Sequence, residues 1–135
     1  MNKPPVRNQK IFYLWAPVFF YAAFIFFLSS FSFHFALFQQ AEKNHADKLA
    51  HIVEYTLFGF LLGRALWRHS PFWGSAKRVL GMALLVGALY AASDEWHQRF
   101  VPERDSSAQD FAADAVGVAL GAWLWIKKTG STSSP

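Results

Sequence analysis

Apolar residues fall into four long blocks that are separated by short hydrophilic gaps. The blocks cover about residues 11–31, 47–67, 78–99 and 110–126. Each is close to the roughly 20 residues that a helix needs to cross the hydrocarbon core of a bilayer. Because the apolar residues run almost continuously and do not form a narrow stripe, they favour membrane helices over a soluble core. The pattern therefore predicts an all-α fold, a four-helix transmembrane bundle.

The composition agrees with a single membrane domain. The chain has 135 residues, 53% of them hydrophobic and 19% aromatic. We expect one transmembrane domain over residues 1–128 and a polar, disordered tail over residues 129–135. The sequence contains no cysteine, which excludes disulfides, thiolate chemistry and cysteine-ligated zinc.

Basic residues lie in the hydrophilic gaps, where they set the orientation of membrane helices. We therefore expect no nucleic-acid partner, although the net charge is +4. Nine of the 13 Lys and Arg residues fall on one side of the predicted spans: Lys3, Arg7, Lys10, Arg64, Arg68, Lys77, Arg78, Lys127 and Lys128. The other four, Lys43, Lys48, Arg99 and Arg104, fall on the opposite side. This asymmetry predicts a multi-pass protein of the inner (cytoplasmic) membrane with both termini in the cytoplasm.

The first block follows Lys3, Arg7 and Lys10, as the apolar part of a signal peptide would. It is too long for a signal peptide, however, and no A-x-A-like cleavage site follows it. We expect a retained helix, with the loops near residues 32–46 and 100–109 facing outward.

Ionisable and polar residues gather at one end of the last three blocks. The depth of each residue follows from the helical rise of about 1.5 Å per residue, measured from the basic residues Arg64, Arg78 and Lys127 at the cytoplasmic end. On this scale, Glu54 lies about 15 Å from the cytoplasmic end, and His51 and Asp114 lie about 20 Å from it. Four more acids lie at about 24–26 Å, near the outer edge of the core: Asp47, Asp94, Glu95 and Asp110. Ionisable groups in membrane helices usually face a polar interior and have a function there. The shared depth predicts one acidic, histidine-containing site that opens outward.

The same residues share helix faces with pairs of glycines. Asp47, His51 and Tyr55 repeat every four residues, and Gly59 and Gly63 continue that line. In the last block, Asp110 and Asp114 lead in the same way into Gly117 and Gly121. Small residues four positions apart let membrane helices approach closely. Tight helix packing is therefore the expected role of the glycines.

Two motifs resemble those of the VanZ-like family of small integral membrane proteins. One is DKLAHIVEYTLFGFLLGRA, from Asp47 to Ala65, and the other is SDEWHQRFVPERDSSAQDFAADAVGVALG, from Ser93 to Gly121. The first block resembles the family only as a hydrophobic span. Relatives often have Gly in place of Glu103, and many have Asn in place of Asp114. The resemblance implies a multi-span membrane protein. The family's namesake is associated with low-level resistance to teicoplanin, a glycopeptide antibiotic that acts outside the cytoplasmic membrane.

The residue types suggest roles within the predicted site. His51 is the candidate general base, with Asp47 and Glu54 as its orienting carboxylates. Arg104, in the loop after Pro102, is the candidate anion-binding group. Candidate ligand-binding residues are Tyr55, Asp94, Glu95, His97, Gln98, Arg104, Asp110 and Asp114. Histidine and carboxylate side chains also suit a divalent cation, but no strong metal-binding signature is present, so metal and cofactor stay unassigned.

Two hypotheses about function remain open at this point. In the first, the site recognises or modifies the polar head of a membrane lipid, a lipid-linked envelope ligand or another cell-surface ligand. In the second, the bundle is a non-enzymatic interaction protein that tunes an envelope enzyme through its Phe-rich first helix. The sequence leaves open whether a bond is broken and whether the chain forms a homo-oligomer.

Overall fold

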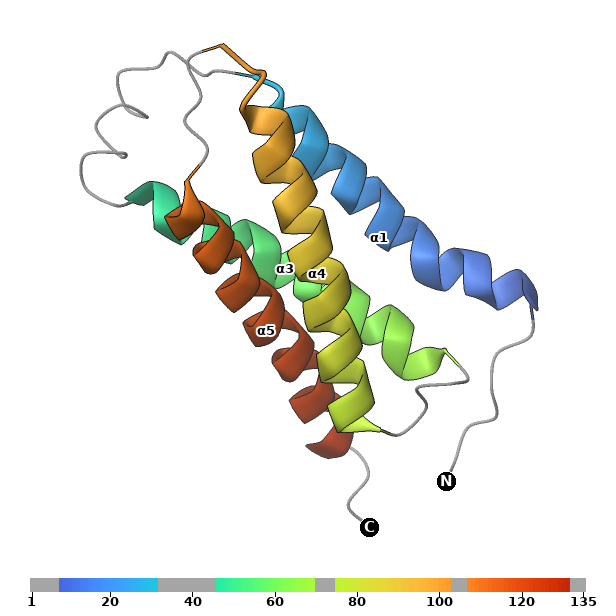
Figure 1. Cartoon of the computed structure of the whole chain (residues 1–135). Coiled ribbons are helices and arrows are strands. Elements are labelled where there is room, and N and C mark those ends of the chain that lie inside the picture. Colours follow the sequence, from blue (N-terminus) through green and yellow to red (C-terminus); the bar gives the residue numbers. More distant parts are fainter. Residues whose placement is uncertain (1–7, 32–45, 70–74, 103–106, 132–135) are drawn as a thin grey trace.

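A computed structural model describes residues 8–31, 46–69, 75–102 and 107–131. These residues form four α-helices: α1 (Asn8–Ser29), α3 (Ala46–Arg68), α4 (Ala76–Gln98) and α5 (Ala108–Ser131) (Figure 1). Strands are absent from these ranges. The predicted all-α, four-helix fold is confirmed, and each helix covers most of one predicted apolar block.

Three of the four helices, α1, α3 and α4, contain segments long and apolar enough to cross a membrane. Helix α5 has 24 residues, and it carries acidic residues near its start and basic residues near its end. It extends to Ser131, so the first residues of the predicted disordered tail are helical. Residues 132–135 lie outside the described ranges.

Successive helices run in opposite directions, and the start of α1 and the end of α5 lie at the same end of the bundle (Figure 1). The ends of α1 and α4 therefore lie beside the starts of α3 and α5. This arrangement brings the polar segments of the sequence to one end of the molecule. Which side of the membrane that end faces remains a prediction from the distribution of charges.

Helices α3 and α5 make the most extensive contact of any helix pair in the bundle. A Cβ atom added at Gly117 would lie 2.6 Å from the carbonyl oxygen of Ile52 and 2.9 Å from the Cβ of Tyr55. One added at Gly59 would overlap the backbone of Val118. The glycines therefore permit backbone-to-backbone contact, as their spacing predicted.

Helix α1 packs on α3 and α4 through one face. Val18 and Ile25 are buried in the core, and the Tyr21 hydroxyl donates a hydrogen bond of 3.2 Å to the carbonyl oxygen of Glu54. The Tyr90 hydroxyl donates to the carbonyl oxygen of Ala22. The opposite face of α1 is exposed and aromatic, as expected for a helix that contacts lipid. It includes Phe12, Tyr13, Phe19, Phe20 and Phe27.

Candidate functional site

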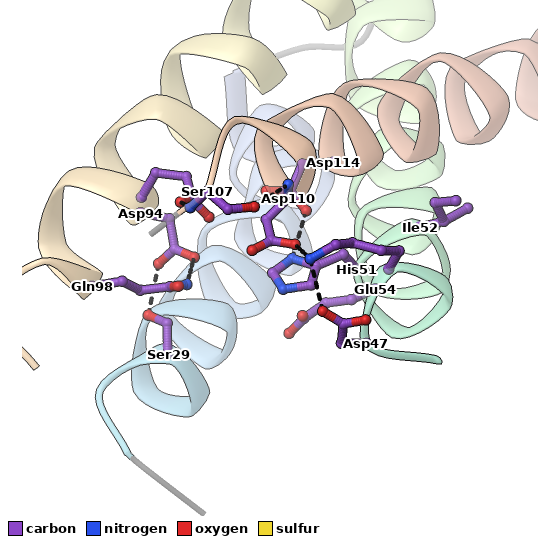
Figure 2. A network of polar contacts seen from close by, with 12 residues as sticks. Ser29, Asp47, His51, Ile52, Glu54, Asp94, Gln98, Ser107, Asp110 and Asp114 are labelled. Carbon is purple, nitrogen blue, oxygen red and sulfur yellow. Dashed lines mark hydrogen bonds and ion pairs between the residues drawn. The ribbon is translucent and has the colours of Figure 1, made fainter. Parts of the chain in front are cut away.

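A lysine links two carboxylates where α3 and α5 begin, those of Asp47 and Asp110, which are labelled in Figure 2. Lys48 Nζ donates to Asp47 Oδ2 at 2.7 Å and also forms an ion pair with Asp110 Oδ1. The side chains of Asp47 and Lys48 are each 24% exposed, whereas that of Asp110 is 9% exposed. Lys48 is therefore the bridge between two acids that the sequence placed at the same depth.

One helical turn further into the bundle, His51 pairs with Asp114. Its Nδ1 lies 2.9 Å from Asp114 Oδ1, and the Asp114 side chain is fully buried. A carboxylate that accepts a hydrogen bond from Nδ1–H fixes the ring orientation and leaves Nε2 as the proton-accepting nitrogen. The His51 side chain keeps 15% of its surface exposed. The pair therefore has the arrangement of an oriented general base.

A second group of polar contacts joins the ends of α1 and α4. Asp94 accepts hydrogen bonds from Ser29 Oγ at 2.6 Å and from Gln98 Nε2 at 2.9 Å, and all three residues are buried. Ser30 Oγ lies 3.0 Å from His97 Nε2, and the His97 ring stacks on Phe26. His97 is therefore held by α1 in this structure.

Glu95 connects α4 to the start of α5. It accepts a hydrogen bond of 2.9 Å from the backbone N–H of Ser107. The Ser107 hydroxyl in turn accepts one of 3.1 Å from the backbone N–H of Asp110, which is the pattern of a helix N-cap. Glu95 and Ser107 thus position the first turn of α5, from which Asp110 projects.

Tyr55 and Glu54 lie further along α3. Tyr55 is fully buried against the rings of Phe58 and Tyr90, and within the described part of the chain its hydroxyl has no hydrogen-bond partner. Glu54 is partly buried and leaves α3 on the same side as Asp47 and His51 (Figure 2). The other predicted group, Arg104, lies outside the described residues.

The structure thus brings seven of the predicted residues, together with Lys48, Ser29 and Ser30, into two groups at one end of the bundle. Asp47, Lys48, His51, Asp110 and Asp114 form the group on α3 and α5. Ser29, Ser30, Asp94, His97 and Gln98 form the group on α1 and α4. We call the two groups together the polar layer.

The sequence analysis missed three members of the polar layer, Lys48, Ser29 and Ser30. Lys48 had been counted only among the basic residues that set the orientation of the helices. The two serines are polar residues near the outer end of the first apolar block, and polar residues gather at the same end of the other three blocks. That position is the signal that could have identified them.

A metal centre receives no support from the described geometry. Among residues 8–31, 46–69, 75–102 and 107–131, no three His, Asp or Glu side chains are arranged to hold a metal ion. The acids of the polar layer are instead paired with lysine, histidine, serine and glutamine. The arrangement is suited to hydrogen bonding and proton transfer with a polar group.

Family comparison agrees with the motifs and the helical fold. The model of the VanZ/LLP1 family matches residues 4–129, nearly the whole chain. The chain belongs to the VanZ/LLP1 family. Together with three helices of membrane-spanning character, this membership identifies it as a VanZ-like membrane protein. No curated protein and no solved structure matches the sequence significantly.

Proposed function

We propose that the polar layer of this VanZ/LLP1 protein binds the polar head of a membrane lipid or lipid-linked envelope ligand at the outer face of the cytoplasmic membrane. The observation that carries this proposal is that all four helices contribute to cross-helix polar contacts at one end of the bundle, α1 with α4 and α3 with α5. Helices supply an apolar wall for the ligand's hydrocarbon tail, and the polar layer supplies partners for its head.

The balance of charges favours a ligand site over a purely structural plug. The polar layer contains four aspartates, Asp47, Asp94, Asp110 and Asp114, and one lysine, Lys48, which pairs with Asp47 and Asp110. Acidic groups crowded away from water are costly unless protons, cations or donors accompany them. A structural plug needs only a few polar residues, whereas this layer is larger, and the side chains of Asp47, Lys48 and His51 are partly exposed.

Any reaction at this site would use His51 as the base. Its Nδ1 is engaged by Asp114, so Nε2 is the nitrogen that can accept a proton from a ligand hydroxyl or from water. Asp114 thus takes the orienting role that the sequence analysis gave to Asp47 and Glu54. Arg104, in the loop after Pro102, is proposed to bind an anionic part of the same head.

The first experiment measures bound lipid directly. Native mass spectrometry of the detergent-purified protein should detect a retained lipid or lipid-linked molecule in the wild type and much less of it in His51→Ala and Asp110→Ala. Phe20→Ala, on the exposed face of α1, is the control and should retain the ligand. Equal retention in all four proteins would contradict the assignment of the site.

The family's namesake is associated with low-level teicoplanin resistance, and this association suggests a test in cells. In cells whose teicoplanin susceptibility changes when the protein is expressed, His51→Ala should abolish the change at unchanged membrane abundance. If Phe20→Ala has the larger effect, the alternative is favoured, in which α1 docks an envelope enzyme.

A further inference from the structure

Tyr55 lies where the two groups of the polar layer approach each other. A Cβ atom added at Gly117 of α5, one helical turn from Asp114, would lie 2.9 Å from the Tyr55 Cβ, and the Tyr55 ring contacts that of Tyr90 on α4, one turn from Asp94. Tyr55 is fully buried, and no described side chain or backbone group accepts or donates a hydrogen bond at its hydroxyl. A buried tyrosine hydroxyl without a hydrogen-bond partner is rare, because no hydrogen bond offsets the free-energy cost of its desolvation.

Asp114 has a second unsatisfied atom in the same region. Its Oδ1 is bound to His51, whereas its Oδ2 is buried and has no partner among the described residues. A carboxylate oxygen only accepts hydrogen bonds. Asp114 Oδ2 therefore requires a donor, and the Tyr55 oxygen, which also has no partner among the described residues, can accept a hydrogen bond as well.

The solvent exposure of the side chains decreases from Asp47 and Lys48, which form the rim of the polar layer, to Asp114 and Tyr55. The side chains of Asp47 and Lys48 are 24% exposed, that of His51 is 15% exposed, and that of Asp114 is 0% exposed. At the rim, the Lys48 ammonium already satisfies two carboxylates. The inner carboxylate, Asp114, is paired in the described chain with the His51 ring and with no lysine or arginine.

We infer that Asp114 and Tyr55 bind a primary ammonium group carried by the head of a membrane lipid. Such a group has three N–H donors and a positive charge. It can donate to Asp114 Oδ2 and to the Tyr55 oxygen while it offsets the acidity of the layer. A quaternary ammonium has the charge without the donors, and water has the donors without the charge. This inference rests on the proposed function and specifies its ligand class.

The test compares two lipids that differ in this group alone. The full-length protein is placed in nanodiscs with equal amounts of phosphatidylethanolamine and phosphatidylcholine that have identical acyl chains, and retained lipid is identified by native mass spectrometry. Because charge-assisted hydrogen bonds are strong, the wild type should prefer the ethanolamine lipid about tenfold or more.

Two substitutions test whether Tyr55 and Asp114 cause the preference for the ethanolamine lipid. Tyr55→Phe removes one hydroxyl, and Asp114→Asn removes the charge with little change of shape. The preference should fall towards unity in either variant, once thermal unfolding has shown that the variant is folded. Tyr13→Phe, at an exposed tyrosine of α1, is the matched control and should keep the preference.

The possible failures separate this inference from the proposed function. A wild type that retains lipid in a His51-dependent way, but equally for both heads, overturns the ammonium site and leaves the proposed function standing. Retention of no lipid at all overturns both. A preference that persists in both folded variants also overturns the ammonium site, because it places recognition elsewhere.

Discussion

The hydrogen bond between Ser29 and Asp94 shows how one hydroxyl can connect an apolar helix to the polar layer. Ser29 and Asp94 are both buried, and the Ser29 oxygen lies 2.6 Å from Asp94 Oδ1. When a buried carboxylate loses a hydrogen-bond donor, the free-energy cost of its desolvation is no longer offset by that hydrogen bond. Ser29 is also the last residue of α1, so this contact fixes the end of that helix against α4.

Ser29→Ala should therefore lower the free energy of unfolding by about 1–3 kcal/mol. The matched control is Ser93→Ala, because the Ser93 hydroxyl is exposed and bonds only within its own helix, to the carbonyl oxygen of Tyr90. Its effect should stay within about 0.5 kcal/mol. Denaturant titration in detergent, followed by circular dichroism, measures both values. Equal effects would show that the Asp94 contact adds no stability.

For single residues, the sequence predicted which acids and histidines lie at the same depth, but it did not predict all of their hydrogen-bond partners. His51 and Asp114 were predicted at equal depth, and they are bonded. Lys48 was not predicted as their neighbour, because a flexible four-carbon side chain can point either to solvent or along the helix. Its direction depends on how α3 is rotated against α5. That rotation is a tertiary property that local spacing does not determine.

Among the helices, the α3–α5 pair positions the polar layer most directly. Gly59 and Gly63 face Val118 and Ala122, and the polar residues on the preceding turns are thereby brought into register. The close approach sets the 2.9 Å contact between His51 and Asp114 one or two turns above. Because the packing is backbone against backbone, there is little room for adjustment.

Gly121→Ala should destabilise the bundle by about 1–3 kcal/mol, the usual cost of overpacking. The added Cβ would overlap the backbone oxygen of Thr56 and approach the backbone N of Phe60. The matched control is Gly81→Ala on α4, where the Cβ would meet nothing within 4 Å. There the higher helix propensity of alanine should leave the melting temperature unchanged or raised. Thermal unfolding of the two variants in the same detergent tests the contrast, which a lowered melting temperature for both would contradict.

Helix positions and glycine packing were predictable because both arise from local patterns. Continuous apolar blocks identify membrane-length helices, and glycines four residues apart identify a face that can approach another helix. The contribution of α1 was not predictable in the same way. Its two terminal serines are chemically ordinary, and only the antiparallel packing of α1 beside α4 places them at Asp94 and His97.

For the whole molecule, the alternating helix directions separate two chemically different ends (Figure 1). One end carries the polar layer, to which all four helices or their flanking residues contribute. The other end carries the start of α1, the end of α5 and most of the described basic residues, among them Arg64, Arg68, Arg78 and Lys127. A site that recognises ligands outside the cytoplasmic membrane requires the first end to face outward.

The orientation can be tested with single cysteines, because the natural chain contains none. Pro102→Cys places an exposed thiol at the end with the polar layer, whereas Ala76→Cys and Gly130→Cys place exposed thiols at the opposite end. Since basic residues are retained in the cytoplasm, a membrane-impermeant maleimide should label residue 102 in intact cells. Residues 76 and 130 should be labelled only after the membrane is permeabilised. The reverse pattern would turn the polar layer towards the cytoplasm, and the ligand would then have to come from the inner leaflet or the cytosol.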